Sequence, residues 1–176
     1  MVTSTRRIRA ATPEDARAIA MVHVASWRAA YRGLLPDAYL DRLSVDEREA
    51  QRREHLDDPS SERGTLVAEE DGRIVGFATF GPSRDEDAPP GTGEVPAIYL
   101  DPGVVGTGVG RALFAEAASG LRNAGFTRAT LWVLGANERA RLFYERAGWT
   151  LDGATSRHDF DCANEPMVRY AVDLSR

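Results

Sequence analysis

The chain has 176 residues, a formal net charge of −5 and a single cysteine, Cys162. This length fits one domain spanning residues 1–176, with a core large enough to fold unaided. The acidic balance argues against nucleic acid as a partner, and one cysteine excludes an internal disulfide. No run of 18 apolar residues occurs, and residues 1–11 lack the apolar centre of a signal peptide. We therefore expect a cytoplasmic protein without a membrane partner.

The first half of the chain predicts an alternation of strand and helix. A strand is expected over residues 6–11, then a helix that Pro13 opens and Thr12 caps, running through Ser26. Further helices are expected at 37–43 and 45–56, followed by strands at 65–70 and 73–80. Asp71-Gly72 between the two strands is a strong hairpin signal. Residues 81–93, rich in Pro, Gly and acid, predict a loop.

The second half continues with an apolar strand at 95–100, a glycine-rich turn and a helix around 112–117. A β-branched and aromatic strand is expected at 128–134, a helix at 137–146, a loop at 152–165 and a last strand at 166–174. Both of these helices stop in Ala-Gly-aromatic-Thr. A left-handed glycine followed by an apolar residue that packs back on the helix explains this repeat.

The glycine-rich turn between strand and helix is the most informative feature. Gly106, Gly108 and Gly110 alternate with other residues and remove side chains that would keep a bulky anion away from the backbone. The unpaired N–H groups that open the next helix, together with the helix dipole, favour a phosphate or pyrophosphate. The chain contains no lysine, which excludes the nucleotide-triphosphate loop, and the glycine spacing does not fit the dinucleotide fingerprint. If this turn is considered without the rest of the chain, the alternative is a glycine-rich connection between strand and helix that binds no ligand.

A second feature lies downstream, where Asn137 and Tyr144 are seven residues apart on the predicted helix. They share one helix face and are separated by about 10 Å along the axis. Asn137 is also suited to cap this helix. The face can hold an extended ligand that runs from an amide-bearing arm to a reactive end. The alternative for Tyr144 is an aromatic side chain packed in the core beside Phe143.

Together these segments resemble the GNAT superfamily of N-acetyltransferases, in particular bacterial members that acetylate small-molecule amines. The family loop, Gln/Arg-x-x-Gly-x-Gly/Ala, falls on residues 105–110. The later family segment matches Asn137, Ala140, Tyr144, Gly148 and Trp149. The chain departs from the family at Val105, where Gln or Arg is usual. Because the cradle is mainly backbone, we expect this departure to weaken cofactor affinity at most.

The resemblance implies an α/β (α+β) single-domain fold with a central mixed, mostly antiparallel sheet of six to seven strands, flanking helices and a splay between the fourth and fifth strands. It implies acetyl-CoA as the cosubstrate and no metal, in keeping with the scattered His23, His55 and His158. The pyrophosphate would lie on the N–H groups of Val105, Gly106, Thr107, Gly108, Val109, Gly110 and Arg111. The backbone of Ile98, Tyr99 and Leu100 would pair with the pantetheine arm, Asn137 would hydrogen-bond it, and small Ala140 would leave it room.

For catalysis the resemblance implies Tyr144 as the general acid that protonates the leaving thiolate. Glu94, at the start of the strand before the loop, is the candidate general base, because part of the family carries a catalytic glutamate there. A solvated glutamate at a strand end is the equally weighted alternative. Pro96 cannot donate a ladder hydrogen bond, so we expect a bulge or local opening beside the reactive carbonyl.

The acceptor is a small-molecule or peptide amine that the sequence does not identify. Trp27 and Tyr31 are candidates to line its pocket, although four-residue spacing also fits core packing. Two segments, 82–94 and 152–165, are expected to border the pocket. Their acidic residues would favour a cationic amine, while a solvated loop is the simpler alternative for most of them: Asp85, Glu86, Asp87, Glu94, Asp152, Asp159, Asp161 and Glu165. Cys162 as an acyl-carrying nucleophile is a minor alternative.

Two functional hypotheses remain open from the sequence. The first is an enzyme that transfers acetyl from acetyl-CoA directly to an amine in a ternary complex. The second is a non-catalytic module that senses acyl-CoA, motivated by Val105 and by the uncertain base. The family further implies a homodimer.

Overall fold

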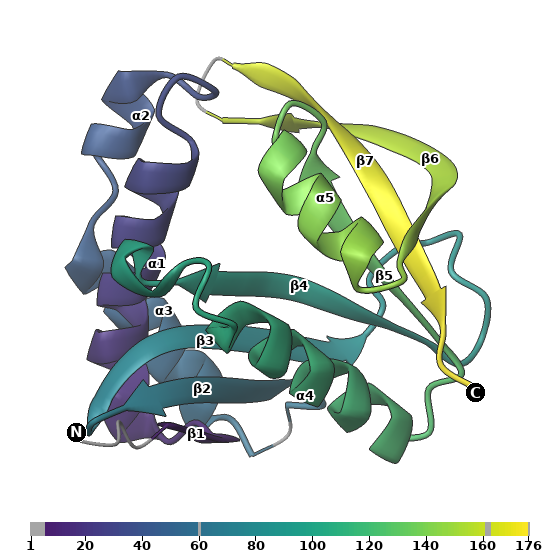
Figure 1. The fold of residues 1–176 in the computed structure, drawn as a ribbon, viewed down its shortest axis with the longest axis horizontal. Coiled ribbons are helices and arrows are strands. Elements are labelled where there is room, and N and C mark those ends of the chain that lie inside the picture. The colour runs from purple at the N-terminus through teal and green to yellow at the C-terminus, as the bar shows by residue number, and fades with distance from the viewer. Residues whose placement is uncertain (1–5, 60, 161–162, 176) are drawn as a thin grey trace.

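A computed structural model describes residues 6–59, 61–160 and 163–175 of the chain (Figure 1). The elements follow in the order β1 (Arg6–Ala10), a 3₁₀ turn (Pro13–Asp15), α1 (Ala16–Ala30), α2 (Asp37–Asp41), α3 (Val45–Asp57), β2 (Gly64–Glu70), β3 (Arg73–Pro82), β4 (Thr92–Leu100), a second 3₁₀ turn (Pro102–Val104), α4 (Val109–Asn123), β5 (Arg128–Leu134), α5 (Glu138–Arg146), β6 (Thr150–Asp159) and β7 (Asn164–Asp173).

Over these residues the strands form one seven-stranded sheet in the order β1-β2-β3-β4-β5-β7-β6. Neighbouring strands are antiparallel except for the parallel pair β4–β5. The predicted mixed, mostly antiparallel sheet with flanking helices is thereby confirmed.

Helices cover both faces of the β2–β4 part of the sheet. In Figure 1, α4 lies in front of these strands, with α1 and α3 behind them. The inner side of α4 carries Leu113, Phe114, Ala117 and Leu121, all buried. Their helical spacing places them on one stripe, and burying each large apolar side chain stabilises the fold by about 1.5–3 kcal/mol. No helix within the described residues is long and apolar enough to cross a membrane.

Glycines end the elements where the sequence predicted turns. The hairpin between β2 and β3 has positive φ at both Asp71 (51°) and Gly72 (78°), as a two-residue type I′ turn requires. Helices α4 and α5 end at left-handed Gly125 and Gly148. The next amides, those of Phe126 and Trp149, then bond back to Leu121 O and Tyr144 O. These are the helix ends predicted from the repeated Ala-Gly-aromatic-Thr.

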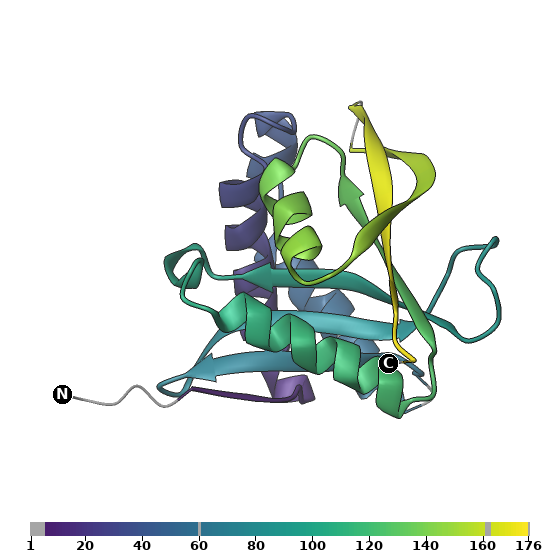
Figure 2. The same cartoon turned by 45° about the vertical axis from the view of Figure 1, so that its right-hand side comes forward.

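The parallel pair β4–β5 is short, and this shapes the centre of the molecule. The two strands are paired from Thr92–Arg128 to Glu94–Thr130 and then diverge, as Figure 2 shows. On its other side β4 is bulged, because three residue steps from Glu94 to Ala97 face only two steps of β3. Pro96 lies in this bulge and has no N–H to donate to either neighbour. The predicted opening at Pro96 and the splay between the fourth and fifth strands are both confirmed.

The main error in the predicted elements concerns residues 152–165, which were expected to be a loop. The structure instead forms β6, paired with β7 along Arg157–Pro166 and His158–Glu165. β6 is an edge strand of the sheet, and nearly all of its residues are exposed. Its sequence therefore lacks the apolar alternation that identifies a half-buried strand.

Buried His23 predicts a specific loss of stability in acid. The imidazole is 7% exposed, stacks on Tyr99, and has no hydrogen-bond partner for either ring nitrogen among the described residues. Burial lowers the pKa of His23 from 6.5 to about 3. Between these pH values the unfolded chain binds a proton that the folded chain does not, so stability falls as pH drops from 6.5 towards 3.

In His23→Phe this proton uptake is absent. We therefore expect the slope of the free energy of unfolding against pH to fall by up to roughly 1.4 kcal/mol per pH unit between pH 6.5 and 4. Urea unfolding of both proteins at several pH values between 6.5 and 4 measures the difference. Equal pH slopes for the two proteins would show that His23 is protonated in the folded state.

Candidate active site

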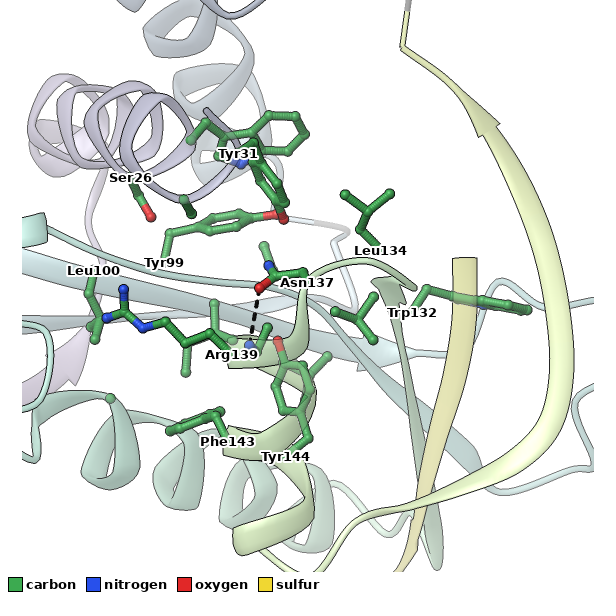
Figure 3. A pocket seen from close by; sticks show the side chains of 18 of the residues that line it. Ser26, Tyr31, Tyr99, Leu100, Trp132, Leu134, Asn137, Arg139, Phe143 and Tyr144 are labelled. Atoms are coloured by element: carbon green, nitrogen blue, oxygen red, sulfur yellow. Dashed lines mark hydrogen bonds between the residues drawn. The ribbon is translucent and has the colours of Figure 1, made fainter. Parts of the chain in front are cut away.

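A cavity of about 650 Å³ lies where β4 and β5 diverge. Its walls come from the end of α1, the second half of β4, the start of α4, β5, α5, and the ends of β6 and β7 (Figure 3). Of the residues predicted to form the site, the lining includes Trp27, Tyr31, Ile98, Tyr99, Leu100, Val105, Gly110, Asn137, Ala140 and Tyr144. The remaining predicted residues, Glu94, Gly106, Thr107, Gly108, Val109 and Arg111, lie outside the lining.

The glycine-rich turn adopts a conformation that presents its amides. Gly106 and Gly108 have φ values of 85° and 91°, and a Cβ added at either would meet no heavy atom within 4 Å. Within α4 the amide of Ala112 bonds to Gly108 O at 3.2 Å. The earlier amides of the helix, 109–111, find no backbone acceptor among the described residues. Open space next to unpaired N–H groups at a helix start fits a phosphate or pyrophosphate.

Gly110 has a different role from the two turn glycines. A Cβ at Gly110 would lie 2.9 Å from Leu100 Cδ1 and 3.6 Å from Phe143. Its lack of a side chain therefore lets the first turn of α4 pack against β4 and α5. The turn itself is tied to its surroundings by Thr107, whose hydroxyl donates to Val104 O at 2.7 Å.

Asn137 is the N-cap of α5, as predicted. Its Oδ1 accepts a hydrogen bond from the amide of Ala140 at 3.1 Å, drawn as the dashed line in Figure 3. Capping uses the amide oxygen, so the Nδ2 group is the part of Asn137 that can donate to a ligand. Ala140 lies one turn further along the same wall.

Tyr144 lies on the same helix with its ring packed among aromatic neighbours. It is 9% exposed, with Phe114 and Tyr170 at 5.4 Å and 6.0 Å between ring centroids. Figure 3 shows its hydroxyl pointing into the space that Asn137 also faces. Burial raises the pKa of Tyr144 well above its usual value of 10. The phenol therefore keeps its proton throughout the physiological pH range.

A hydrogen-bond network holds α5 in place beneath these groups. Tyr170 of β7 is fully buried and donates to Glu145 Oε1 at 2.6 Å. Arg141 donates to the Tyr170 hydroxyl at 3.2 Å and to Gly135 O at 3.1 Å. The middle and the end of α5 are thereby both joined to the Tyr170 hydroxyl of β7, and Arg141 also ties the helix to the loop that precedes it.

The free edge of β4 faces the cavity. Ile98, Tyr99 and Leu100 pair with β3 on one side, while β5 has already diverged on the other. This leaves backbone groups available for a ligand that adds to the sheet edge. The Tyr99 side chain packs away from this edge, against His23 and Trp27.

Glu94 lies before the divergence, where β4 still pairs with β5. It is 3% exposed, and its Oε1 accepts hydrogen bonds from Arg63 Nη2 at 2.8 Å and Arg84 Nε at 2.5 Å. Arg84 lines the cavity and Glu94 does not. The Glu94 carboxylate therefore does not contact the cavity directly; it acts on the cavity only by positioning the Arg84 side chain.

Three carboxylates of the predicted acidic rim are held in ion pairs in the fold. Arg169 of β7 donates to Asp85 at 3.0 Å, to both oxygens of Asp87 and to Asp152 at 2.8 Å. Its guanidinium also lies 5.4 Å from the centre of the Trp132 ring, and Trp132 donates to Asp85. We refer to Arg169 with Asp85, Asp87 and Asp152 as the Arg169 clasp; it fixes the β3–β4 loop to β6 and β7. Attraction of a cationic amine by these carboxylates is therefore not supported.

The side of the cavity opposite the glycine-rich turn is mainly aromatic. Trp27 lies 4.9 Å from Tyr31 and 6.1 Å from Phe160 between ring centroids. Sequence reasoning did not identify several lining residues: Ser26, Arg84, Trp132, Arg139, Phe143, His158, Phe160 and Met167. His158 lies in β6 and Phe160 directly after it, within the segment that the sequence predicts as a loop, so a strand prediction there was the signal that could have brought them to the cavity. Cys162 and Asp161 lie outside the described residues.

Comparison with known proteins adds an independent line of support. Residues 18–149 match the model of the acetyltransferase (GNAT) family. A relative, the uncharacterized N-acetyltransferase YuaI of Bacillus subtilis, is 38% identical over 139 residues, covering 78% of this chain and 76% of its own. The PaiA N-acetyltransferase of Thermoplasma acidophilum, solved with coenzyme A, has a TM-score of 0.75 at 19% identity and covers 96% and 99% of the two chains. The yncA protein of Salmonella typhimurium, solved with acetyl-CoA, has a TM-score of 0.69 at 23% identity and covers 96% and 94%.

Proposed function

The chain belongs to the acetyltransferase (GNAT) family, and from this we propose that it transfers the acetyl group of acetyl-CoA to a primary amine of a small molecule or peptide. The transfer takes place by direct attack in a ternary complex. The observation that carries this proposal is the joint presence of unpaired helix amides at one end of the cavity and a buried, protonated Tyr144 at its centre.

Binding of acetyl-CoA is assigned to the glycine-rich turn and the free edge of β4. The amides of Val105, Gly106, Thr107, Gly108, Val109, Gly110 and Arg111 frame the pyrophosphate position, although the Thr107 amide also bonds to Val104 O within the turn. Arg139 adds positive charge on this side. Ile98, Tyr99 and Leu100 offer backbone groups to the pantetheine arm, and Asn137 donates to it through Nδ2. Both glycine positions leave the turn open, so the residues present fit such a ligand.

Acetyl-CoA supplies an activated acyl group with a thiolate leaving group. Tyr144 is placed to donate its proton to that sulfur as the bond to carbon breaks. The raised pKa keeps the phenol protonated but makes it a weaker acid, so the hydroxyl first stabilises the leaving sulfur by a hydrogen bond and gives up its proton only as the thiolate forms. Trp27 and Tyr31 hold the acceptor on the opposite side of the thioester, within the aromatic part of the cavity.

The amine must lose a proton before it attacks, and Glu94 was the predicted base. Glu94 accepts two guanidinium hydrogen bonds and is absent from the lining, so direct contact with the amine is not its observed arrangement. We assign it a positioning role through Arg84 and leave proton removal to water in the cavity. A base role for Glu94 acting through water stays a prediction.

A screen of amine acceptors with acetyl-CoA, following liberated thiol, tests the activity. The enzyme hypothesis predicts acceptor-dependent release of CoA. A protein that binds acetyl-CoA but releases no thiol with any amine would instead be a sensor of acyl-CoA. Because every basic side chain of the chain is arginine, acetylation of its own lysines cannot contribute to the signal.

Gly108→Ala tests the turn directly. At φ 91° an alanine costs about 1–2 kcal/mol, and the strain is relieved by shifting the amides of the turn. We expect the affinity for acetyl-CoA, measured by calorimetry, to fall about tenfold or more. Gly125→Ala is the matched control, since it has the same φ of 91°, equally open space and a position at the far end of α4. Equal affinity in the two variants would refute the role of the turn.

A further inference from the structure

We propose that the acceptor carries a carboxylate, bound by Arg84, on an apolar or aromatic body. This inference rests on the proposed function and names the class of amine that the acceptor side of the cavity selects. It reverses the expectation of a cationic substrate that the acidic sequence suggested.

The charge of the cavity wall favours an anionic group on the acceptor. Among the described residues that line the cavity, none is Asp or Glu, whereas Arg84 and Arg139 are both present. Arg139 extends past Asn137 towards Leu100, on the side of the glycine-rich turn (Figure 3). Arg84 belongs to the β3–β4 loop and is therefore the cation of the acceptor side. An anionic group on the acceptor is favoured there, because the guanidinium attracts it and no carboxylate among the described lining residues repels it.

Arg84 is held so that the outer edge of its guanidinium stays free of acceptors from the described residues. Its Nε donates to Glu94 Oε1 at 2.5 Å, and Glu94 is itself fixed by Arg63. Among the described residues, the two terminal nitrogens of Arg84 have no protein acceptor, and the side chain is 68% exposed. A guanidinium anchored through Nε presents its outer edge, with two parallel N–H groups, in the geometry that binds a carboxylate at two points.

The Arg169 clasp supports the same residue from the other side. Asp85, the immediate neighbour of Arg84, accepts hydrogen bonds from Arg169 and from Trp132 Nε1. The loop is thus fixed on both sides of Arg84, by Glu94 through the side chain and by Arg169 through the next residue. Such preorganisation reduces the entropy lost when a ligand binds.

Aromatic rings provide the surface for the rest of the acceptor. Trp27, Tyr31, Trp132 and Phe160 line the cavity, and His158 lies 4.5 Å from Phe160 between ring centroids. An amine with an aromatic or branched apolar body buries its surface here, whereas a polyamine would bring further positive charge to Arg84. The cavity thus favours an amino acid, or a peptide end that bears a carboxylate, with a large apolar side chain.

A matched pair of product analogues tests this without depending on turnover. N-acetyl-L-phenylalanine and N-acetyl-L-phenylalaninamide differ only in the carboxylate, and quenching of tryptophan fluorescence follows binding because Trp27 and Trp132 line the cavity. Both are titrated into the protein with and without saturating CoA. We expect the carboxylate to bind about 10-fold to 100-fold more tightly than the amide, and Arg84→Gln to abolish this preference.

Arg63→Gln is the matched control, because Arg63 also binds Glu94 but does not line the cavity. It should keep most of the preference for the carboxylate. Equal binding of the two analogues, tighter binding of the amide, or no binding of either at millimolar concentration would overturn the proposal. Binding of CoA in the same titrations is scored separately: its failure would contradict the proposed function, whereas CoA binding without a carboxylate preference would contradict only the assignment of Arg84.

Discussion

Replacing Tyr144 by phenylalanine is expected to lower kcat by about 10²-fold to 10⁴-fold while leaving the affinity for acetyl-CoA nearly unchanged. The ring of Tyr144 packs against Phe114 and Phe143, contacts that phenylalanine keeps. Only the hydroxyl that faces the cavity is lost, and with it the proton for the departing thiolate. Thiol release with the preferred acceptor measures kcat, and calorimetry measures the affinity.

The pH dependence of the wild-type enzyme provides a second readout of Tyr144. Burial raises the pKa of this phenol above 10, so its proton remains in place as the pH passes the usual value for tyrosine. Tyr144 should therefore cause no loss of rate up to pH 10. Tyr39→Phe serves as the control for Tyr144→Phe in the turnover measurement, because Tyr39 contacts Trp27 and Phe160 but does not line the cavity. We expect it to keep its kcat. Full turnover by Tyr144→Phe would remove the acid role.

Arg169→Met is expected to lower the free energy of unfolding, which is the second large effect. Arg169 is 8% exposed and holds three carboxylates, of which Asp85 and Asp152 are themselves largely buried. Methionine leaves Asp85 with only Trp132 and Asp152 with only Arg128 as a side-chain partner among the described residues, which costs about 3 kcal/mol of the free energy of unfolding. Urea denaturation measures the loss.

An exposed ion pair of the same type provides the comparison for Arg169. Arg7 is 61% exposed and bonds to Glu69 at 3.1 Å, so Arg7→Met should cost less than about 1 kcal/mol. If Arg169→Met were no more destabilising than Arg7→Met, the Arg169 clasp would contribute nothing to the fold. In the intact protein the clasp also carries the loop that positions Arg84, which links stability to acceptor binding.

Local chemistry made most of the fold predictable. Asp71-Gly72, the two glycines at the helix ends and the cap at Asn137 each require a particular backbone conformation, and the structure has it. Pro96 identified the break in β4 because proline cannot donate a hydrogen bond. The family and the enzyme class, an N-acetyltransferase, are confirmed by the comparisons, and the glycine-rich turn with Asn137 and Tyr144 was sufficient to predict them.

What the sequence did not predict depends on contacts between distant residues. Glu94 meets Arg63 and Arg84 because β3 pairs with both β2 and β4, and no local pattern indicates that its carboxylate is already bound. Asp85 and Asp87 of the acidic loop are bound by Arg169, which lies more than 80 positions away in the sequence, and no local pattern indicates this pairing. The outer strand β6 lacks a buried face, so its residues at the cavity could not be identified.

The central claim is that the free amides before and within the first turn of α4 bind the diphosphate of coenzyme A and so place its sulfur next to Tyr144. A crystal structure of the protein with coenzyme A tests it most directly. We predict phosphate oxygens within hydrogen-bonding distance of the amides between Gly106 and Arg111, with the pantetheine arm along β4 and the thiol beside the Tyr144 hydroxyl. Coenzyme A bound at another place on the protein, with these amides making no contact to it, would contradict the account.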